Sequence, residues 1–319
     1  MKNNELKIVF MGTPSFSKKC LARLIAEEYN VVLCVCQPDK PVGRKHILTA
    51  PETKVFALEN GIEVFQPTSM KSEESFDKIK ALEPDLIVTA AYGKILPQSV
   101  LDIPKFGCLN VHASLLPKYR GAAPVQYSIL NGDDVTGVTI MKMDAGMDTG
   151  DMITTVEVPI DPNIDTDGLM DQLADAGSEL LIKTIPDWVE GKLQTIPQDE
   201  DKVTLSPPIT PDMGKFSWNQ TTRQIHDKVR ALRAWPGAQT MFDGKKMKIY
   251  VSAIATEEEA AALDASVPAG TVVKAHKADL IVRTGDGFLK ILELQAEGGK
   301  RLKSCDCAHN YKIGMRFGE

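Results

Sequence analysis

Short apolar runs that alternate with helical patterns constrain the fold of this chain most strongly. The runs, rich in Val, Ile and Leu, cover residues 6–10, 31–36, 62–65, 85–91 and 107–111. Helical spacing between them covers residues 15–28, 52–59 and 72–82. Strands that are apolar throughout and alternate with helices are typical of a parallel sheet with both faces covered. We therefore predict a Rossmann-like, mostly parallel α/β sheet, continued by strands at 138–143 and 152–158 and closed by a helix at 167–189.

The second part of the chain has a different pattern. Residues 191–210 are rich in Pro, Asp and Gln and lack periodicity, which is typical of a linker. A T-x-x-Q capping box at 221–224 then begins a short helix, and glycine-punctuated strands such as MKIYVSAI follow. This pattern predicts a small β-barrel or sandwich. We expect one domain at 1–190, a linker at 191–208 and a second domain at 209–319.

Composition excludes several classes of protein. With 43% hydrophobic and 25% charged residues, the 319-residue chain has the composition of a globular protein. It has no run of about 18 apolar residues that would predict a membrane span. The first apolar run is shorter than the roughly 7–15 residues of an export signal, so we expect a cytoplasmic location. Neither G-x-G-x-x-G nor a P-loop pattern follows the first strand, and no dinucleotide or P-loop site is predicted.

Charge is distributed unevenly along the chain, whose net charge is −6. Residues 209–319 contain 17 Lys/Arg and 13 Asp/Glu, whereas the remainder contains 20 and 30. The resulting excess of +4 in the second part is consistent with a polyanionic partner, and equally with ordinary variation in surface charge.

The cysteines do not predict a metal centre. Cys34 and Cys36 lie in an apolar run and are expected to be buried thiols. Cys305 and Cys307 lie close to His309, but the usual spacing of zinc ligands is missing. We therefore predict no metal site.

The stretch NVHASLLPKYRG at 110–121 holds the first candidate site. Residues two apart in a strand point to the same face, so Asn110 and His112 should lie side by side. They fall at the carboxyl end of a predicted strand, where open α/β sheets bind their ligands. An amide can donate to a developing oxyanion, and an imidazole can move a proton near neutral pH. A histidine satisfied within the core, beside a turn asparagine, would give the same pattern.

The stretch MDAGMDTGD at 143–151 holds the second candidate site. Asp144, Asp148 and Asp151 lie in a glycine-rich loop between two predicted strands. A carboxylate beside His112 would fix the orientation of its ring. A solvated acidic turn is the alternative, and a divalent metal site is disfavoured because the spacing is not that of an EF-hand loop.

Taken together, these stretches resemble a known family. NVHASLLPKYRGAAPVQ with TGVTIMKMDAGMDTGDM is similar to the formyltransferases that use 10-formyltetrahydrofolate, and further stretches from VFMGTPSFS to GGKRLK extend the similarity along the chain. The resemblance implies a catalytic trio of Asn110, His112 and Asp148. It implies that the second domain is an OB-type barrel that contacts tRNA. It also implies a folate-binding segment formed by Ser114, Leu115, Leu116 and Pro117, and tRNA contacts by Arg44, Lys45, Arg301 and Lys303.

The implied reaction is transfer of the formyl group from 10-formyltetrahydrofolate to the α-amino group of methionine on charged initiator tRNA. No membrane contact and a monomeric state are expected. Formyltransferases acting on glycinamide ribonucleotide or on sugar nucleotides share the core, and a 10-formyltetrahydrofolate hydrolase would share the trio while using water as the acceptor. A non-catalytic RNA-binding protein is the alternative from a different class.

Overall fold

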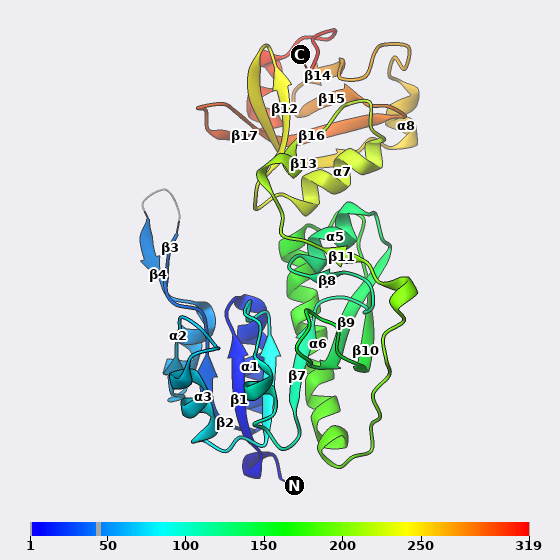
Figure 1. Ribbon diagram of the computed structural model, residues 1–319. Coiled ribbons are helices and arrows are strands. Elements are labelled where there is room, and N and C mark those ends of the chain that lie inside the picture. The colour runs from blue at the N-terminus through cyan, green and yellow to red at the C-terminus, as the bar shows by residue number, and fades with distance from the viewer. Residues whose placement is uncertain (1, 43–45, 319) are drawn as a thin grey trace. The chain divides into compact units, whose positions relative to one another are not determined.

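The computed structural model describes residues 2–42 and 46–318 (Figure 1). The chain divides into two compact units. The first comprises Met1–Pro124, Val135–Pro159 and Met170–Pro207, and the second comprises Val125–Asp134, Ile160–Leu169 and Pro208–Glu319. Each unit therefore includes segments that are distant in sequence.

The first unit is built on a seven-stranded sheet in the order β10-β9-β7-β6-β1-β2-β5. Its strands are β1 (Lys7–Gly12), β2 (Asn30–Val35), β5 (Val64–Phe65), β6 (Leu86–Ala90), β7 (Cys108–His112), β9 (Val135–Lys142) and β10 (Met152–Pro159). Within the sheet, the neighbouring strands β7, β6, β1, β2 and β5 pair in parallel. Strand β9 is antiparallel to both of its neighbours, β7 and β10. The predicted mostly parallel sheet is confirmed.

Helices cover both faces of this sheet, as the apolar strands require. They are α1 (Ser15–Ala26), α2 (Glu52–Glu59), α3 (Glu73–Lys80), α4 (Gln98–Leu101) and α6 (Thr166–Val189). On one face, Val9 and Ile87 pack with Ile79 of α3 and Val100 of α4. On the other face, α6 and α1 are joined through Lys19, which pairs with Asp171 and Asp175 at 2.6 and 2.8 Å.

A glycine lets α6 approach the sheet closely. A Cβ atom added to Gly177 would lie 3.0 Å from Cγ1 of Val111 in β7 and 3.1 Å from Cγ1 of Val138 in β9. The side chain of Val111 therefore faces α6. Because side chains alternate along a strand, Asn110 and His112 face the other side of the sheet.

Smaller elements complete the first unit. They are η1 (Asn3–Glu5), β3 (Lys40–Val42), β4 (Ile47–Thr49), β8 (Arg120–Gly121), η2 (Glu200–Lys202) and β11 (Leu205–Ser206). Strands β3 and β4 form a hairpin that projects away from the sheet (Figure 1). Residues 191–208, which the sequence predicts to be a linker, make contacts with the first unit. Strand β11 pairs in parallel with β8, and Ser206 is fully buried.

The second unit contains a six-stranded antiparallel sheet and several short helices. Strands run in the order β12-β13-β16-β15-β14, and β17 pairs with β16. The elements are α5 (Pro124–Leu130), η3 (Pro211–Gly214), α7 (Thr222–Ala231), β12 (Ala238–Phe242), β13 (Lys245–Ile254), α8 (Glu257–Ala261), β14 (Val272–His276), β15 (Asp279–Arg283), β16 (Phe288–Ala296), β17 (Arg301–Lys303), α9 (Ser304–Cys307) and η4 (Ala308–Asn310). The predicted capping box of α7, Thr221 with Gln224, is present.

The C-terminal segment joins the two edge strands of this sheet. The amide of Gly318 donates to the carbonyl of Met241 in β12, and the amide of Phe317 donates to the carbonyl of Gly270, next to β14. Phe317 packs with Trp218 inside the sheet at a centroid distance of 5.6 Å. The expectation of a separate small β domain is confirmed, and its sheet edges are closed by backbone pairing.

Candidate functional site

Asn110 and His112 lie at the carboxyl end of β7, the parallel strand that adjoins the antiparallel part of the sheet. Asn110 is partly exposed and pairs in register with Thr89 of β6. The Thr89 hydroxyl donates to Oδ1 of Asn110 at 2.8 Å. This contact assigns the oxygen of the amide to the Thr89 side, so the NH₂ group points elsewhere as a donor. No local sequence pattern indicates Thr89, because it lies on another strand.

Both ring nitrogens of His112 face acceptors, and the residue is only 6% exposed. Nε2 lies 3.1 Å from the carbonyl oxygen of Tyr119. A carbonyl only accepts, so Nε2 carries a hydrogen. Nδ1 lies 3.7 Å from Oδ1 of Asp148, a distance that suits an ion pair but exceeds a direct hydrogen bond. The ring is therefore placed so that an imidazolium would face a carboxylate.

Asp148, rather than Asp144, is the aspartate that faces His112. Asp148 has φ +56°, a conformation that few residues other than glycine adopt. Its Oδ2 accepts a hydrogen bond of 2.9 Å from the amide of Gly121 in β8. Asp144 instead accepts from Gly146 and Thr149 within its own loop, at 3.0 and 2.6 Å. The structure thus brings together the three residues predicted as a catalytic trio.

The predicted folate segment, Ser114 to Pro117, begins two residues after the end of β7 and is held by hydrogen bonds to the neighbouring strand. Thr139 of β9 donates to the carbonyl of Ser114 at 2.8 Å and accepts from the amide of Leu116 at 3.1 Å. Ser114 is fully buried, and its hydroxyl donates to the carbonyl of Lys118 at 2.6 Å. Leu116 is 6% exposed, whereas Leu115 and Pro117 are partly exposed.

Of the predicted tRNA contacts, Arg44 and Lys45 lie outside the described residues, and Arg301 and Lys303 lie on β17 in the second unit. Arg301 is exposed, but its side chain already contacts two other residues. Its guanidinium pairs with Glu293 at 2.7 Å and lies 4.2 Å from the ring centroid of Tyr250. Lys303 is exposed and pairs in register with Glu293 through the backbone.

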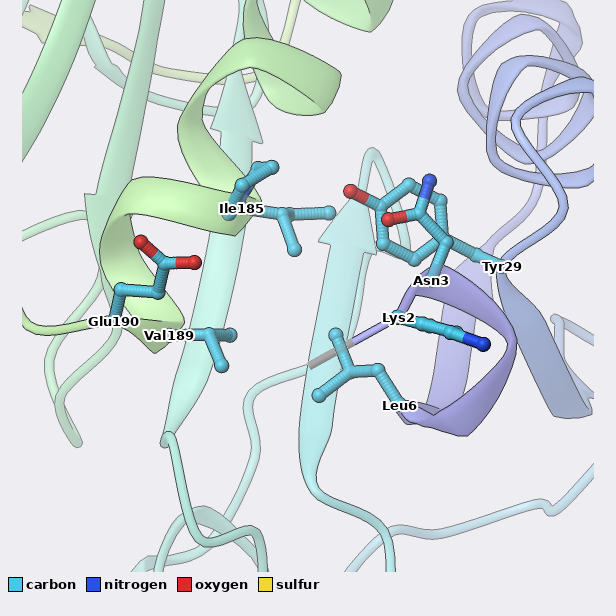
Figure 2. A pocket seen from close by; sticks show the side chains of 8 residues that line it. Lys2, Asn3, Leu6, Tyr29, Ile185, Val189 and Glu190 are labelled. Carbon is cyan, nitrogen blue, oxygen red and sulfur yellow. The ribbon is translucent and has the colours of Figure 1, made fainter.

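A separate pocket lies near the amino ends of β1 and β2 (Figure 2). The trio instead lies at the carboxyl end of β7. Leu6, Tyr29 and Ile185 are among the residues that line it. Within the part of the chain that the structure describes, the Tyr29 hydroxyl has no hydrogen-bond partner, and burial raises the pKa of Tyr29 to about 12. The Tyr29 phenol therefore stays protonated near neutral pH.

The cysteines are all free thiols, and Cys34 and Cys36 are buried as predicted. Burial raises the pKa of Cys34 to about 12 and that of Cys36 to about 11, so both are protonated near neutral pH. Among residues 2–42 and 46–318, no group of three or more His, Cys, Asp or Glu side chains could hold a metal ion. In the same ranges, no helix is long and apolar enough to cross a membrane.

Comparison with known proteins places this geometry in context. The methionyl-tRNA formyltransferase of Macrococcus caseolyticus is 45% identical over 316 residues, which cover 98% of this chain and 99% of that protein. That of Bacillus cytotoxicus is also 45% identical, over 317 residues covering 98% and 99%.

Solved structures share the fold at lower identity. The sugar 3N-formyl transferase WlaRD, in the presence of dTDP and 5-N-formyl-THF, matches with a TM-score of 0.65 and 21% identity over 89% of this chain and 96% of that one. HypX from Aquifex aeolicus in complex with tetrahydrofolic acid matches with a TM-score of 0.65 and 18% identity, over 94% of this chain but only 46% of HypX. The present chain thus spans about half the length of HypX.

The family models cover both parts of the chain. The model described as formyl transferase matches residues 6–185, and the model described as formyl transferase, C-terminal domain, matches residues 208–312. The first match alone includes β7, the loop with Asp148 and more than half of the sequence. The chain therefore belongs to the formyl transferase family.

Proposed function

We propose that this chain transfers the formyl group of 10-formyltetrahydrofolate to the α-amino group of methionine on charged initiator tRNA, for translation initiation. The observation that carries the proposal is the convergence of Asn110, His112 and Asp148 at one sheet edge, in a chain 45% identical to methionyl-tRNA formyltransferases over nearly its whole length. The folate is a substrate, and the site supplies the groups that acyl transfer needs: a neutral donor, an imidazole and a carboxylate.

The first step is attack of the methionine amine on the formyl carbon, which places negative charge on the formyl oxygen. The Asn110 NH₂ group is available to donate to that oxygen, because Thr89 holds the opposite side of the amide. The His112 imidazolium adds positive charge beside the same oxygen. Preorganised donors of this kind are usually the largest contribution to acyl-transfer catalysis.

The second step breaks the bond between the formyl carbon and N10 of the folate. N10 takes up a proton, and the attacking amine loses one. His112, with Asp148 opposite Nδ1, is placed to carry this proton through water. Both products leave without a covalent bond to the protein, so no serine or cysteine nucleophile is required.

The segment 114–117 would contact the folate through its exposed parts. Leu115 and Pro117 are partly exposed and offer apolar surface to a flat ring. Ser114 and Leu116 are buried and would act by holding the backbone in place. Arg44, Lys45, Arg301 and Lys303 are proposed to contact tRNA, the polyanionic partner that favours basic side chains. We also propose that the protein acts as a cytoplasmic monomer, which sedimentation analysis would test.

An acceptor panel tests the proposed reaction. Purified protein and 10-formyltetrahydrofolate would be mixed with methionine-charged initiator tRNA, the uncharged tRNA, an amino-sugar nucleotide, or no acceptor. Formyl-methionyl-tRNA formed only with the charged tRNA is the expected result. Formylation of the sugar, or release of formate without any acceptor, would instead assign one of the related activities and overturn the proposal.

A further inference from the structure

Asp148 is held by a residue that lies outside its own loop. The side chain of Gln198, fifty residues further along the chain, places its amide nitrogen against that loop. Nε2 donates to the carbonyl oxygen of Asp148 at 2.8 Å and to that of Gly150 at 2.7 Å. Both hydrogens of the amide are thus used on carbonyl groups of the loop. Asp148 is in the left-handed region, φ +56°, and such a residue persists where its surroundings hold it there.

The orientation of Gln198 is itself fixed by a buried charge. Arg120 is 5% exposed, and its Nε donates to Oε1 of Gln198 at 2.9 Å. A guanidinium has no acceptor, so the oxygen of the amide must face Arg120 and the nitrogen must face the loop. Arg120 lies on β8, next to Gly121, whose amide donates to Oδ2 of Asp148. Gln198, oriented by Arg120, therefore holds the backbone of Asp148, and the amide of Gly121 holds its side chain.

We propose that Gln198 is a positioning residue for Asp148, and that Arg120 orients Gln198 for this role. Gln198 does not touch the reacting atoms. Its two donors keep the loop where Oδ1 of Asp148 faces His112, and this part of the proposal rests on the proposed function of that pair. Loss of the donors lets the carboxylate leave Nδ1 and lowers the rate of transfer without removing the folate or tRNA contacts.

Two substitutions separate the donors from the contact with Arg120. Gln198→Ala removes the two donors and also the contact with Arg120. Gln198→Glu keeps an acceptor for Arg120 but puts an oxygen against the two carbonyl groups. Both variants are expected to lower the single-turnover rate of formyl transfer by about 10- to 100-fold, with KM for the charged tRNA changed by less than about threefold. Lys202→Ala, which removes an exposed partner of Asp199 on the same segment, serves as the control and is expected to retain the wild-type rate. A wild-type rate for Gln198→Glu would overturn the proposal.

A double-mutant cycle tests whether Gln198 acts through Asp148. In the Asp148→Asn background the carboxylate is already gone, so Gln198→Ala is expected to lower the rate by no more than about threefold further. Residues that act through one another are non-additive in this way. Fully additive losses would show that Gln198 merely stabilises the fold, and would contradict the proposal.

Amide exchange supplies a readout that needs no activity. In the structure, the Gly121 amide donates to Asp148, while the neighbouring amides of Arg120 and Ala122 donate to the carbonyls of Thr204 and Ser206. Gln198→Ala is expected to accelerate exchange at Gly121 and to leave Arg120 and Ala122 protected. Unchanged exchange at Gly121 would overturn the positioning role. Faster exchange at Gly121 in a protein with no transferase activity would leave the positioning role intact and reject the proposed function instead.

Discussion

A single hydroxyl group decides which way the amide at the end of β7 points. Thr89 is 3% exposed and donates to Oδ1 of Asn110. Thr89→Val keeps the shape of the side chain and removes that donor. Because one hydrogen bond contributes about 0.5–1.5 kcal/mol, kcat should fall by about 2- to 12-fold while KM for the folate stays close to the wild-type value. Thr184→Val is a matched control, since Thr184 is equally buried and bonds to Thr154. Equal effects of the two substitutions on kcat would contradict the role of Thr89.

The sequence predicted the trio but not the residues that hold it. Asn110 and His112 form a recognisable pair because they lie two apart in one predicted strand, and Asp148 is implied by the resemblance to the family. Thr89, Gly121 and Gln198 reach the trio from other strands and segments. A glutamine in an aperiodic stretch carries no local signal, so its contact with the loop could only be found in the folded chain.

At the scale of elements, close packing of α6 on the sheet fixes the position of β7. Gly177→Val would place side-chain atoms against Val111 and Val138, which a Cβ alone would approach at 3.0 and 3.1 Å. Overpacking of this kind typically costs about 1–3 kcal/mol. We expect a lower urea midpoint for Gly177→Val and little change for Glu179→Ala, a position on the exposed face of the same helix. A midpoint equal to that of the wild type would show that the helix can move away without cost.

A buried histidine makes the docking of α7 sensitive to acid. His226 is 3% exposed, and its Nε2 donates to the carbonyl of Pro162 while Nδ1 accepts from the Ser252 hydroxyl. Burial lowers the pKa of His226 below its usual 6.5; Arg230 and Arg223 also lower it, and the Pro162 carbonyl and Asp227 oppose the shift. The unfolded chain therefore binds this proton more readily, so the free energy of unfolding should fall as the pH drops below about 6.5.

The measurement is the urea midpoint at pH 7.5 and at pH 5.5 for the wild type and His226→Asn. The wild type should lose more stability between the two pH values than the variant, because asparagine cannot take up the proton. An identical loss in both proteins would assign the acid sensitivity to other groups.

Elements were predicted well where periodicity was strong and poorly indicated where it was absent. The strand expected at 107–111 is β7 at Cys108–His112, and the helix expected at 167–189 is α6 at Thr166–Val189. Both segments have a clear apolar pattern, because one or both of their faces are buried. Strand β11 has only two residues, and the pairing partner that defines it lies at Arg120–Gly121. No local pattern in residues 191–208 could have revealed that pairing.

At the scale of the whole molecule, folding changes the charge balance seen in the sequence. Residues 209–319 have 17 basic and 13 acidic side chains, but the second unit also includes 125–134 and 160–169, which add five aspartates and no Lys or Arg. That unit therefore holds 17 basic and 18 acidic side chains. Arg233, for example, pairs with Asp165 at 2.5 Å. Binding of a polyanion to this unit would depend on where its basic residues lie, because its net charge provides no attraction.

The exposed strand β17 provides a test at this scale. The logarithm of the binding constant falls linearly with the logarithm of the salt concentration. Each phosphate contact that is lost should make this slope shallower by about one. Lys303→Ala is expected to make the salt dependence of tRNA binding shallower by this amount. Arg301→Ala should have a smaller effect, because Glu293 already pairs with that guanidinium at 2.7 Å. Lys183→Ala, an exposed position in the first unit, is the control. Equal slopes for Lys303→Ala and Lys183→Ala would remove β17 from the proposed tRNA surface.

The single-turnover rate of formyl transfer in His112→Ala tests the central claim most directly. Charged initiator tRNA and 10-formyltetrahydrofolate would be mixed with an excess of wild-type or variant protein, and formyl-methionyl-tRNA followed in time. Because loss of one group that stabilises an oxyanion costs about 10²–10³ in rate, His112→Ala should be slowed by at least that order, with folate affinity retained. A variant that transfers the formyl group at the wild-type rate would contradict the assignment of the chemistry to the end of β7.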